Sequence, residues 1–219
     1  MIITLAGIKG GTGKTTVAAA LAAEAERRGA RTLLVDATRR HDLSAWAREG
    51  GFSGPVVNLH PDQDLEQLPA LTDLALGAEF CVVDTATEDM RVAPRLASQS
   101  DLVLFPCAAS PLDVWPLLGA FERFSARGLL DRRLRVLLSN FDPNSRLGRD
   151  VRRDLETHGI PLSAAEFPRR AVHAEALAYG SNVVAEAPRS TAAREVMALY
   201  DTLFDTRTER TWDEEAVVH

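Results

Sequence analysis

Lysine and cysteine are both scarce in this 219-residue chain. Lys9 and Lys14 are the only lysines, and arginine supplies all the other strongly basic side chains. Cys81 and Cys107 lie in apolar stretches without the spacing of metal ligands, which argues against a disulfide framework or a zinc site. We therefore expect both thiols to be buried and reduced in a cytoplasmic protein.

Long apolar runs are absent as well, because no stretch approaches the roughly 18 residues needed to span a bilayer. No basic segment precedes the first apolar run, so no signal peptide is expected. A hydrophobic content of 46% suits one domain with a sizeable core, which we expect over residues 1–205. The acidic tail, 206–219, is expected to fray and to be repelled by anionic lipid, so we expect no membrane partner.

Short apolar runs alternate with helical patterns along the chain. The expected strands are Ile2–Ile8, Thr32–Val35, Val56–Leu59, Phe80–Asp84, Leu102–Pro106, Leu134–Ser139 and a weaker one at Ala164–Phe167. The expected helices are Thr15–Arg28, Leu43–Glu49, Arg91–Ser98, Pro111–Arg127, Arg146–Thr157, Ala171–Ala178 and Thr191–Phe204. This alternation predicts an α/β fold, a largely parallel twisted sheet with helices on both faces.

Both lysines fall in one glycine-rich stretch between the first expected strand and the first expected helix. Strand, glycine-rich turn and helix together are the setting of a phosphate-binding loop. The glycines allow a tight turn whose N–H groups point inward as an anion-binding nest, beside a positive helix N-terminus. The residues that we expect to hold the nucleotide are Lys9, Gly10, Gly11, Thr12, Gly13, Lys14, Thr15 and Thr16.

Three side chains of this stretch have distinct expected contacts. Lys14 is expected along the β- and γ-phosphates, Thr15 on Mg²⁺ and Thr16 on an α-phosphate oxygen. A glycine-rich turn with two solvated lysines is the alternative, and the strand–loop–helix setting disfavours it. The sequence therefore predicts a site for ATP and Mg²⁺.

Two aspartates end apolar strands at the edge of the sheet where ligands of such folds bind. A bare carboxylate at Asp84 would be costly to bury unless it met a cation, and a water of Mg²⁺ is a natural partner. Capping of the next turn is the alternative for Asp84. Asp36 is interpreted in the same way, near Mg²⁺ or as a catalytic group beside the attacking water.

The phosphate loop departs from the usual pattern, because Ile8 stands where the first glycine belongs and Lys9 follows it. This lysine-first form resembles the deviant Walker A loop of the ParA/MinD family of P-loop ATPases. Further stretches are similar to that family in the same order along the chain: Leu33–Asp36, Trp46, Phe80–Thr85, Asp101–Pro106, Ser110–Asp113, Phe141–Pro143, Arg146–Leu147, Val151, Arg170 and Ala174–Ala176.

The resemblance implies an ATP-dependent homodimer in which Lys9 reaches across to the partner's nucleotide, so that Lys9 and Lys14 both act in catalysis. It also implies that Asn140 reads the adenine edge, although turn initiation explains a lone asparagine there equally well. By the same resemblance, the protein positions a DNA or protein cargo, holds non-specific DNA when ATP is bound, and so associates with the nucleoid. A ParB-like or adaptor protein would stimulate its ATPase activity.

Candidate DNA-binding residues lie in a stretch rich in arginine, although the whole chain has a net charge of −6. The stretch from position 123 to position 170 contains eleven arginines and six acidic residues. The residues that we expect to contact phosphate are Arg146, Arg149, Arg153, Arg169 and Arg170. The alternative is a solvated face on which neighbouring acids neutralise these arginines.

The chain differs from the family at the position of the aspartate that positions the hydrolytic water, where it has Thr38. A hydroxyl is a far poorer base than a carboxylate, so we expect slow ATP hydrolysis. Asp42 lies four residues further on and would substitute only if the loop folds back. Ala86 and Thr87 stand where the family has two prolines, which predicts a looser loop.

Two other functions stay open on the sequence. An ATP-binding switch with little or no hydrolysis, acting through protein partners, is the main alternative because of Thr38. A small-molecule ligase or a metal-cofactor assembly ATPase with the same loop is the other, and neither an interfacial cysteine pair nor a second polar pocket is evident.

Overall fold

In the computed structural model, parallel strands form one sheet in the order β3-β2-β4-β1-β5-β6. The structure describes residues 1–7, 9–87, 91–110, 113–114, 116–117, 119–120 and 133–204. The strands are β1 (Ile2–Leu5), β2 (Thr32–Ala37), β3 (Val56–Asn58), β4 (Phe80–Thr85), β5 (Leu102–Cys107) and β6 (Leu134–Leu138). The predicted parallel α/β sheet is confirmed.

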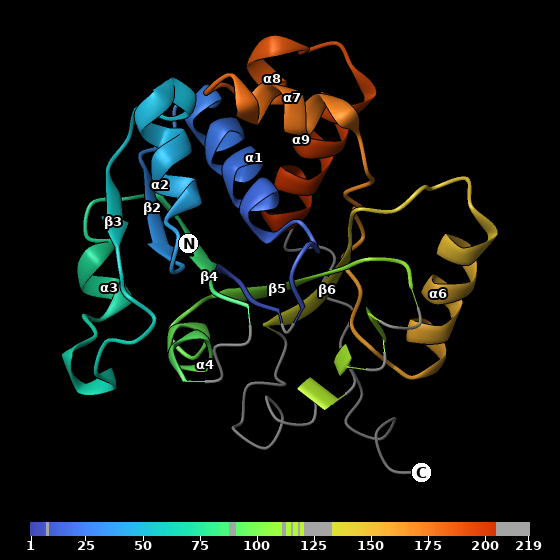
Figure 1. The fold of residues 1–219 in the computed structure, drawn as a ribbon, viewed down its shortest axis with the longest axis horizontal. Helices are drawn as coiled ribbons and strands as arrows, with labels where there is room; N and C mark the ends of the chain where they lie inside the picture. The colour runs from blue at the N-terminus through green and yellow to red at the C-terminus, as the bar shows by residue number, and fades with distance from the viewer. Residues whose placement is uncertain are drawn as a thin grey trace.

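Helices cover both faces of this sheet (Figure 1). The α-helices are α1 (Lys14–Arg27), α2 (Asp42–Trp46), α3 (Leu71–Leu74), α4 (Val92–Ala97), α6 (Arg146–Thr157), α7 (Ala171–Ala178), α8 (Val183–Glu186) and α9 (Thr191–Phe204). A π-helical turn, η1 (Ala47–Gly51), extends α2, and a 3-10 turn, η2 (Leu65–Gln67), precedes α3.

Alternate residues along each strand enter different parts of the core, as the two-residue period of a strand requires. Ile3 and Leu5 of β1 pack in the cluster that holds α1 and α9, whereas Ile2 packs with residues of α3 and α4. A further cluster joins β5 and β6 to Val151 and Leu155 of α6. The strands and α1 fix the loop between β1 and α1, which holds Lys9 and leads into Lys14, the first residue of α1.

The expected elements differ from the observed ones in three places. β1 ends at Leu5, before the loop begins, and not at Ile8, which lies outside the described residues. The expected strand at Ala164–Phe167 is wrong as a strand, because only isolated bridges form there: Leu162 pairs with Val136 of β6, and Phe167 pairs with Ser139 just after β6. The short helices α3 and α8 were not predicted.

Parts of two predictions lie outside the described residues: most of the helix expected at Pro111–Arg127, and the tail at 206–219. Both cysteines are buried and free, and burial raises the pKa of the Cys81 and Cys107 thiols to about 12. In the part of the chain that the structure describes, no helix has the length and apolar character needed to cross a membrane.

Candidate nucleotide-binding site

The loop between β1 and α1 has the backbone that a phosphate cradle needs. Gly11 and Gly13 have φ angles of 77° and 92°, a left-handed conformation that favours glycine. Hydrogen bonds from the end of β6 fix the loop, because Ser139 Oγ donates to Thr12 O at 2.7 Å and Asn140 Nδ2 donates to Gly11 O at 2.9 Å. Asn140 therefore contacts the loop itself, whether or not it also reads a base.

Lys14 begins α1 and points into the site with only 7% of its surface exposed. Its ammonium donates to Thr87 Oγ1 at 2.8 Å and to Lys9 O at 3.3 Å. Burial lowers the pKa of Lys14, and the charge of Asp84 opposes that shift. A buried ammonium held by neutral oxygens gains most from an anionic ligand, which is the setting that a phosphate would complete.

Thr15 and Asp84 meet beside Lys14, because the Thr15 hydroxyl donates to Asp84 Oδ2 at 2.6 Å. Asp84 is fully buried at the end of β4, and its Oδ1 has no hydrogen-bond partner among the described residues. Burial raises the pKa of Asp84 to about 7, with a further rise from Asp36, while the Thr15 hydrogen bond and Lys14 lower it. A hydroxyl beside a carboxylate with a free oxygen fits a hydrated Mg²⁺.

Asp36 of β2 is the register partner of Asp84 on the neighbouring strand β4. Its carboxylate nevertheless binds the segment that follows β2. Its Oδ1 accepts from Thr38 N at 3.1 Å and from Thr38 Oγ1 at 2.7 Å, and its Oδ2 accepts from Ser44 N at 2.9 Å. Fully buried Asp36 thus holds the Thr38–Ser44 segment against the sheet. The residues in these contacts are up to eight positions apart in the chain, so no periodic pattern in the sequence predicts them.

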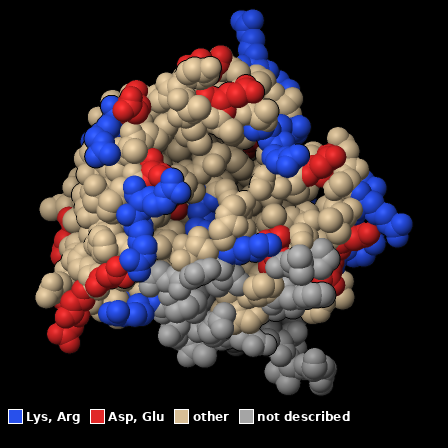
Figure 2. All heavy atoms as spheres, in the orientation of Figure 1, with Lys and Arg blue, Asp and Glu red and all other residues tan. Residues whose placement is uncertain are grey.

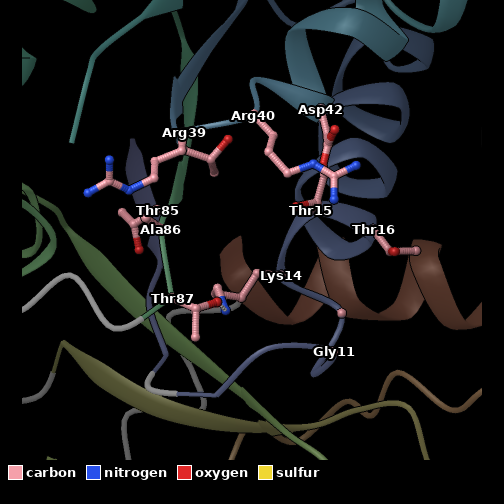
Figure 3. Close-up of a pocket in the computed structure, with 12 residues that line it drawn as sticks. Gly11, Lys14, Thr15, Thr16, Arg39, Arg40, Asp42, Thr85, Ala86 and Thr87 are labelled. Carbon is pink, nitrogen blue, oxygen red and sulfur yellow. Dashed lines mark hydrogen bonds and ion pairs between the residues drawn. The ribbon is translucent and has the colours of Figure 1, made fainter. Parts of the chain in front are cut away.

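A cavity of about 370 Å³ opens over the phosphate loop (Figure 3). Figure 3 places Arg40 and Asp42 on one side of the cavity and Lys14, Thr87 and Gly11 on the other. The residues that line it are Gly11, Gly13, Lys14, Thr15, Thr16, Thr38, Arg39, Arg40, Asp42, Thr85, Ala86 and Thr87. The predicted loop thus faces the segment after β2 and the end of β4.

Comparison with known proteins agrees with this geometry. Residues 3–183 match the family described as the CobQ/CobB/MinD/ParA nucleotide binding domain. The chain belongs to this family.

Individual relatives in this ParA/MinD family match most of the chain. The chromosome-partitioning ATPase Soj of Thermus thermophilus is 31% identical over 87% of this chain and 90% of its own. The maintenance of carboxysome distribution protein A of Halothiobacillus neapolitanus is 29% identical over 83% of this chain and 85% of its own. The septum site-determining protein MinD of Pyrococcus horikoshii, solved with Mg-ADP, has the same fold, with a TM-score of 0.73 at 18% identity, covering 94% of this chain and 97% of its own.

Lys9 is the residue that makes the phosphate loop resemble that of this family, but it does not line the cavity of its own chain. Its ammonium lies 2.7 Å from the carboxylate of Asp113, and its side chain is 45% exposed while that of Asp113 is 6% exposed. The ammonium is thus held at the surface of the loop, next to a buried acid. Nothing in the sequence marks this pair, because the two residues are far apart in the chain.

The arginines that we expect to bind DNA lie in two groups. Arg146 and Arg153 of α6 both pair loosely with Asp150, at 3.3 and 3.5 Å, and Arg149 donates to Asn144 O at 3.0 Å. Figure 2 shows basic side chains gathered at the edge of the molecule over α6, with acidic ones between them. Before α7, Arg169 is exposed, whereas Arg170 forms two hydrogen bonds with Glu195, at 3.1 and 2.6 Å.

Proposed function

We propose that this chain is a ParA-like ATPase that binds ATP with Mg²⁺, dimerises in that state, and holds non-specific DNA in order to position a DNA or protein cargo. The observation that carries the proposal is the arrangement around the phosphate loop. There, Lys14 and Thr15 line one cavity, and the Thr15 hydroxyl donates to Asp84, whose Oδ1 has no hydrogen-bond partner among the described residues.

Each of these groups has a role in the proposed site. Lys14 offers its charge to the β- and γ-phosphates, and the loop N–H groups hold the phosphate oxygens. Thr15 and Asp84 would hold Mg²⁺ and its waters, which neutralise charge on the phosphates. The relatives named for chromosome partition and for carboxysome distribution support a positioning role. A stimulating adaptor and association with the nucleoid belong to the same proposal.

Steady-state phosphate release with Mg²⁺ and ATP, with and without DNA, tests the ATPase activity. We expect slow release that stays above the background set by the Lys14→Ala variant. A rate equal to that background under both conditions would favour the second candidate, an ATP-binding switch. One observation favours the switch, namely that the Thr38 hydroxyl is already engaged with Asp36 and with His41 N.

DNA binding is expected to depend on the exposed arginines of α6. The double charge reversal Arg149→Glu with Arg153→Glu should weaken binding to duplexes of any sequence, because contacts to phosphate carry no sequence information. The plot of log affinity against log salt should become shallower by about two, because each arginine that no longer neutralises a phosphate lowers the slope by about one. Fluorescence anisotropy with a non-hydrolysable ATP analogue measures both quantities.

The matched control for this double charge reversal is Arg95→Glu with Arg189→Glu, at two exposed arginines on α4 and before α9. It should leave both the affinity and the salt dependence unchanged, and ATP affinity should be the same in all variants. An equal loss of DNA affinity in the control would mean that net charge, and not the α6 surface, governs binding.

A further inference from the structure

The segment after β2 presents two arginines and one carboxylate to the cavity over the phosphate loop. The two arginines differ in how firmly their ion-pair partners hold them. Arg39 forms two hydrogen bonds with Asp62, at 2.5 and 2.6 Å, so its guanidinium is already engaged. Among the described residues, Arg40 has a single loose partner, Asp42, at 3.4 Å, and 84% of its side chain is exposed. Arg40 is therefore the more available cation of the two.

Thr38 is poorly placed to receive a proton from water. Its hydroxyl has one proton, which it donates to Asp36 Oδ1 at 2.7 Å, and its oxygen accepts from His41 N at 3.1 Å. Asp36 is fully buried, and both of its oxygens accept hydrogen bonds within the same segment. Thr38 and Asp36 thus build the loop, and a second carboxylate is needed if water is to be activated.

Asp42 meets that need. It is the one carboxylate among the described residues that line the cavity, and its side chain is 55% exposed. His41, in a left-handed conformation with a φ of 52°, turns the chain immediately before it. Figure 3 shows the side chains of Arg40 and Asp42 together, above Thr15. The 3.4 Å between Arg40 and Asp42 is longer than a normal charge-assisted hydrogen bond, so this pair exchanges readily for a better partner.

We propose that Asp42 is the catalytic carboxylate of this chain and that Arg40 binds the terminal phosphate of ATP, which frees Asp42 to hold the attacking water. This inference rests on the ATPase activity proposed above. The water oxygen bonds to the γ-phosphorus, and the bond from that phosphorus to the β–γ bridging oxygen breaks with its electron pair left on ADP. Asp42 accepts the proton of the water and returns it to the released phosphate.

Two variants with matched controls test the proposal. Asp42→Asn keeps the shape of the side chain but removes the base, and it should lower single-turnover phosphate release about a hundred-fold. ATP affinity should be retained, and the bound nucleotide recovered after incubation should be mostly ATP, whereas wild type yields ADP. Asp73→Asn, an exposed acid on α3, should behave as wild type.

Arg40→Ala supplies a readout that does not depend on turnover. Loss of a charge-assisted hydrogen bond to the γ-phosphate should lower the ratio of ATP affinity to ADP affinity about ten-fold. Arg189→Ala, an exposed arginine before α9, should leave that ratio unchanged. Fluorescent analogues of ATP and ADP measure both affinities, and thermal unfolding checks that each variant is folded.

The outcomes separate this inference from the function on which it rests. If wild type hydrolyses ATP and Asp42→Asn does so at the same rate, Asp42 is not the base. An equal loss of ATP and ADP affinity in Arg40→Ala would overturn the contact to the γ-phosphate. Phosphate release by wild type no faster than by Lys14→Ala, with or without DNA, would overturn the ATPase activity itself, and the role of Asp42 with it.

Discussion

Lys14→Ala is expected to abolish ATP binding at concentrations that saturate the wild type. The ammonium of Lys14 is buried, and its hydrogen-bond partners among the described residues are neutral oxygens, so a phosphate is the partner that offsets its desolvation. Truncation of one member of a buried, hydrogen-bonded charge pair costs about 2–5 kcal/mol, or roughly thirty-fold to several-thousand-fold in affinity. Titration with a fluorescent ATP analogue measures the loss.

The thermal stability of Lys14→Ala without nucleotide should not fall together with its affinity for ATP. Burial lowers the pKa of Lys14, which means that the folded protein gains little from the charged form in the absence of ligand. The midpoint of thermal unfolding without nucleotide should therefore be close to that of wild type. ATP should raise that midpoint for the wild type but not for Lys14→Ala. A variant that still bound ATP with nearly wild-type affinity would contradict the role of Lys14.

Lys9→Ala is expected to bind ATP normally but to lose ATP-dependent dimerisation. Lys9 does not line the cavity of its own chain, and its ammonium is held by Asp113 at 2.7 Å. To reach the phosphates of a partner, Lys9 must exchange this pair for theirs. Light scattering with a non-hydrolysable ATP analogue should give a doubled mass for wild type and an unchanged mass for Lys9→Ala.

Asp113→Asn supplies the matched control for this experiment. In Lys9→Ala the carboxylate of Asp113 is left buried without its cation, and a loss of dimer could reflect that cost alone. The double variant Lys9→Ala with Asp113→Asn removes the stranded charge. It should remain a monomer, whereas Asp113→Asn alone should dimerise at least as well as wild type. Recovery of the dimer in the double variant would contradict a cross-interface role for Lys9.

The positions of the strands along the chain and the place of the phosphate loop were predictable because they depend on local pattern. The apolar run Phe80–Thr85 favours a buried strand, and the glycines before α1 favour a tight turn, whatever the rest of the chain does. The expected strand at Ala164–Phe167 was wrong as a strand, because Pro161 and Pro168 flank the segment and a bend at 164–165 leaves only two bridges. Proline has no N–H to donate to a neighbouring strand.

The contacts of the candidate site were harder to predict, because they join residues that only the fold brings together. Asp36 was expected beside Mg²⁺ or water, but its oxygens bind Thr38 and Ser44. The engagement of Arg39 by Asp62, 23 residues away, likewise leaves no mark in the sequence. Such pairings decide which side chains of the loop remain available to a ligand.

DNA binding by the wild-type protein in three nucleotide states tests the proposed function most directly. Anisotropy of a labelled random-sequence duplex would be measured at low salt without nucleotide, with Mg²⁺ and ADP, and with Mg²⁺ and a non-hydrolysable ATP analogue. We expect tight, salt-sensitive binding with the ATP analogue and weak binding in the other two states. Equal affinity in all three states, or no binding with the analogue, would contradict an ATP-regulated hold on DNA.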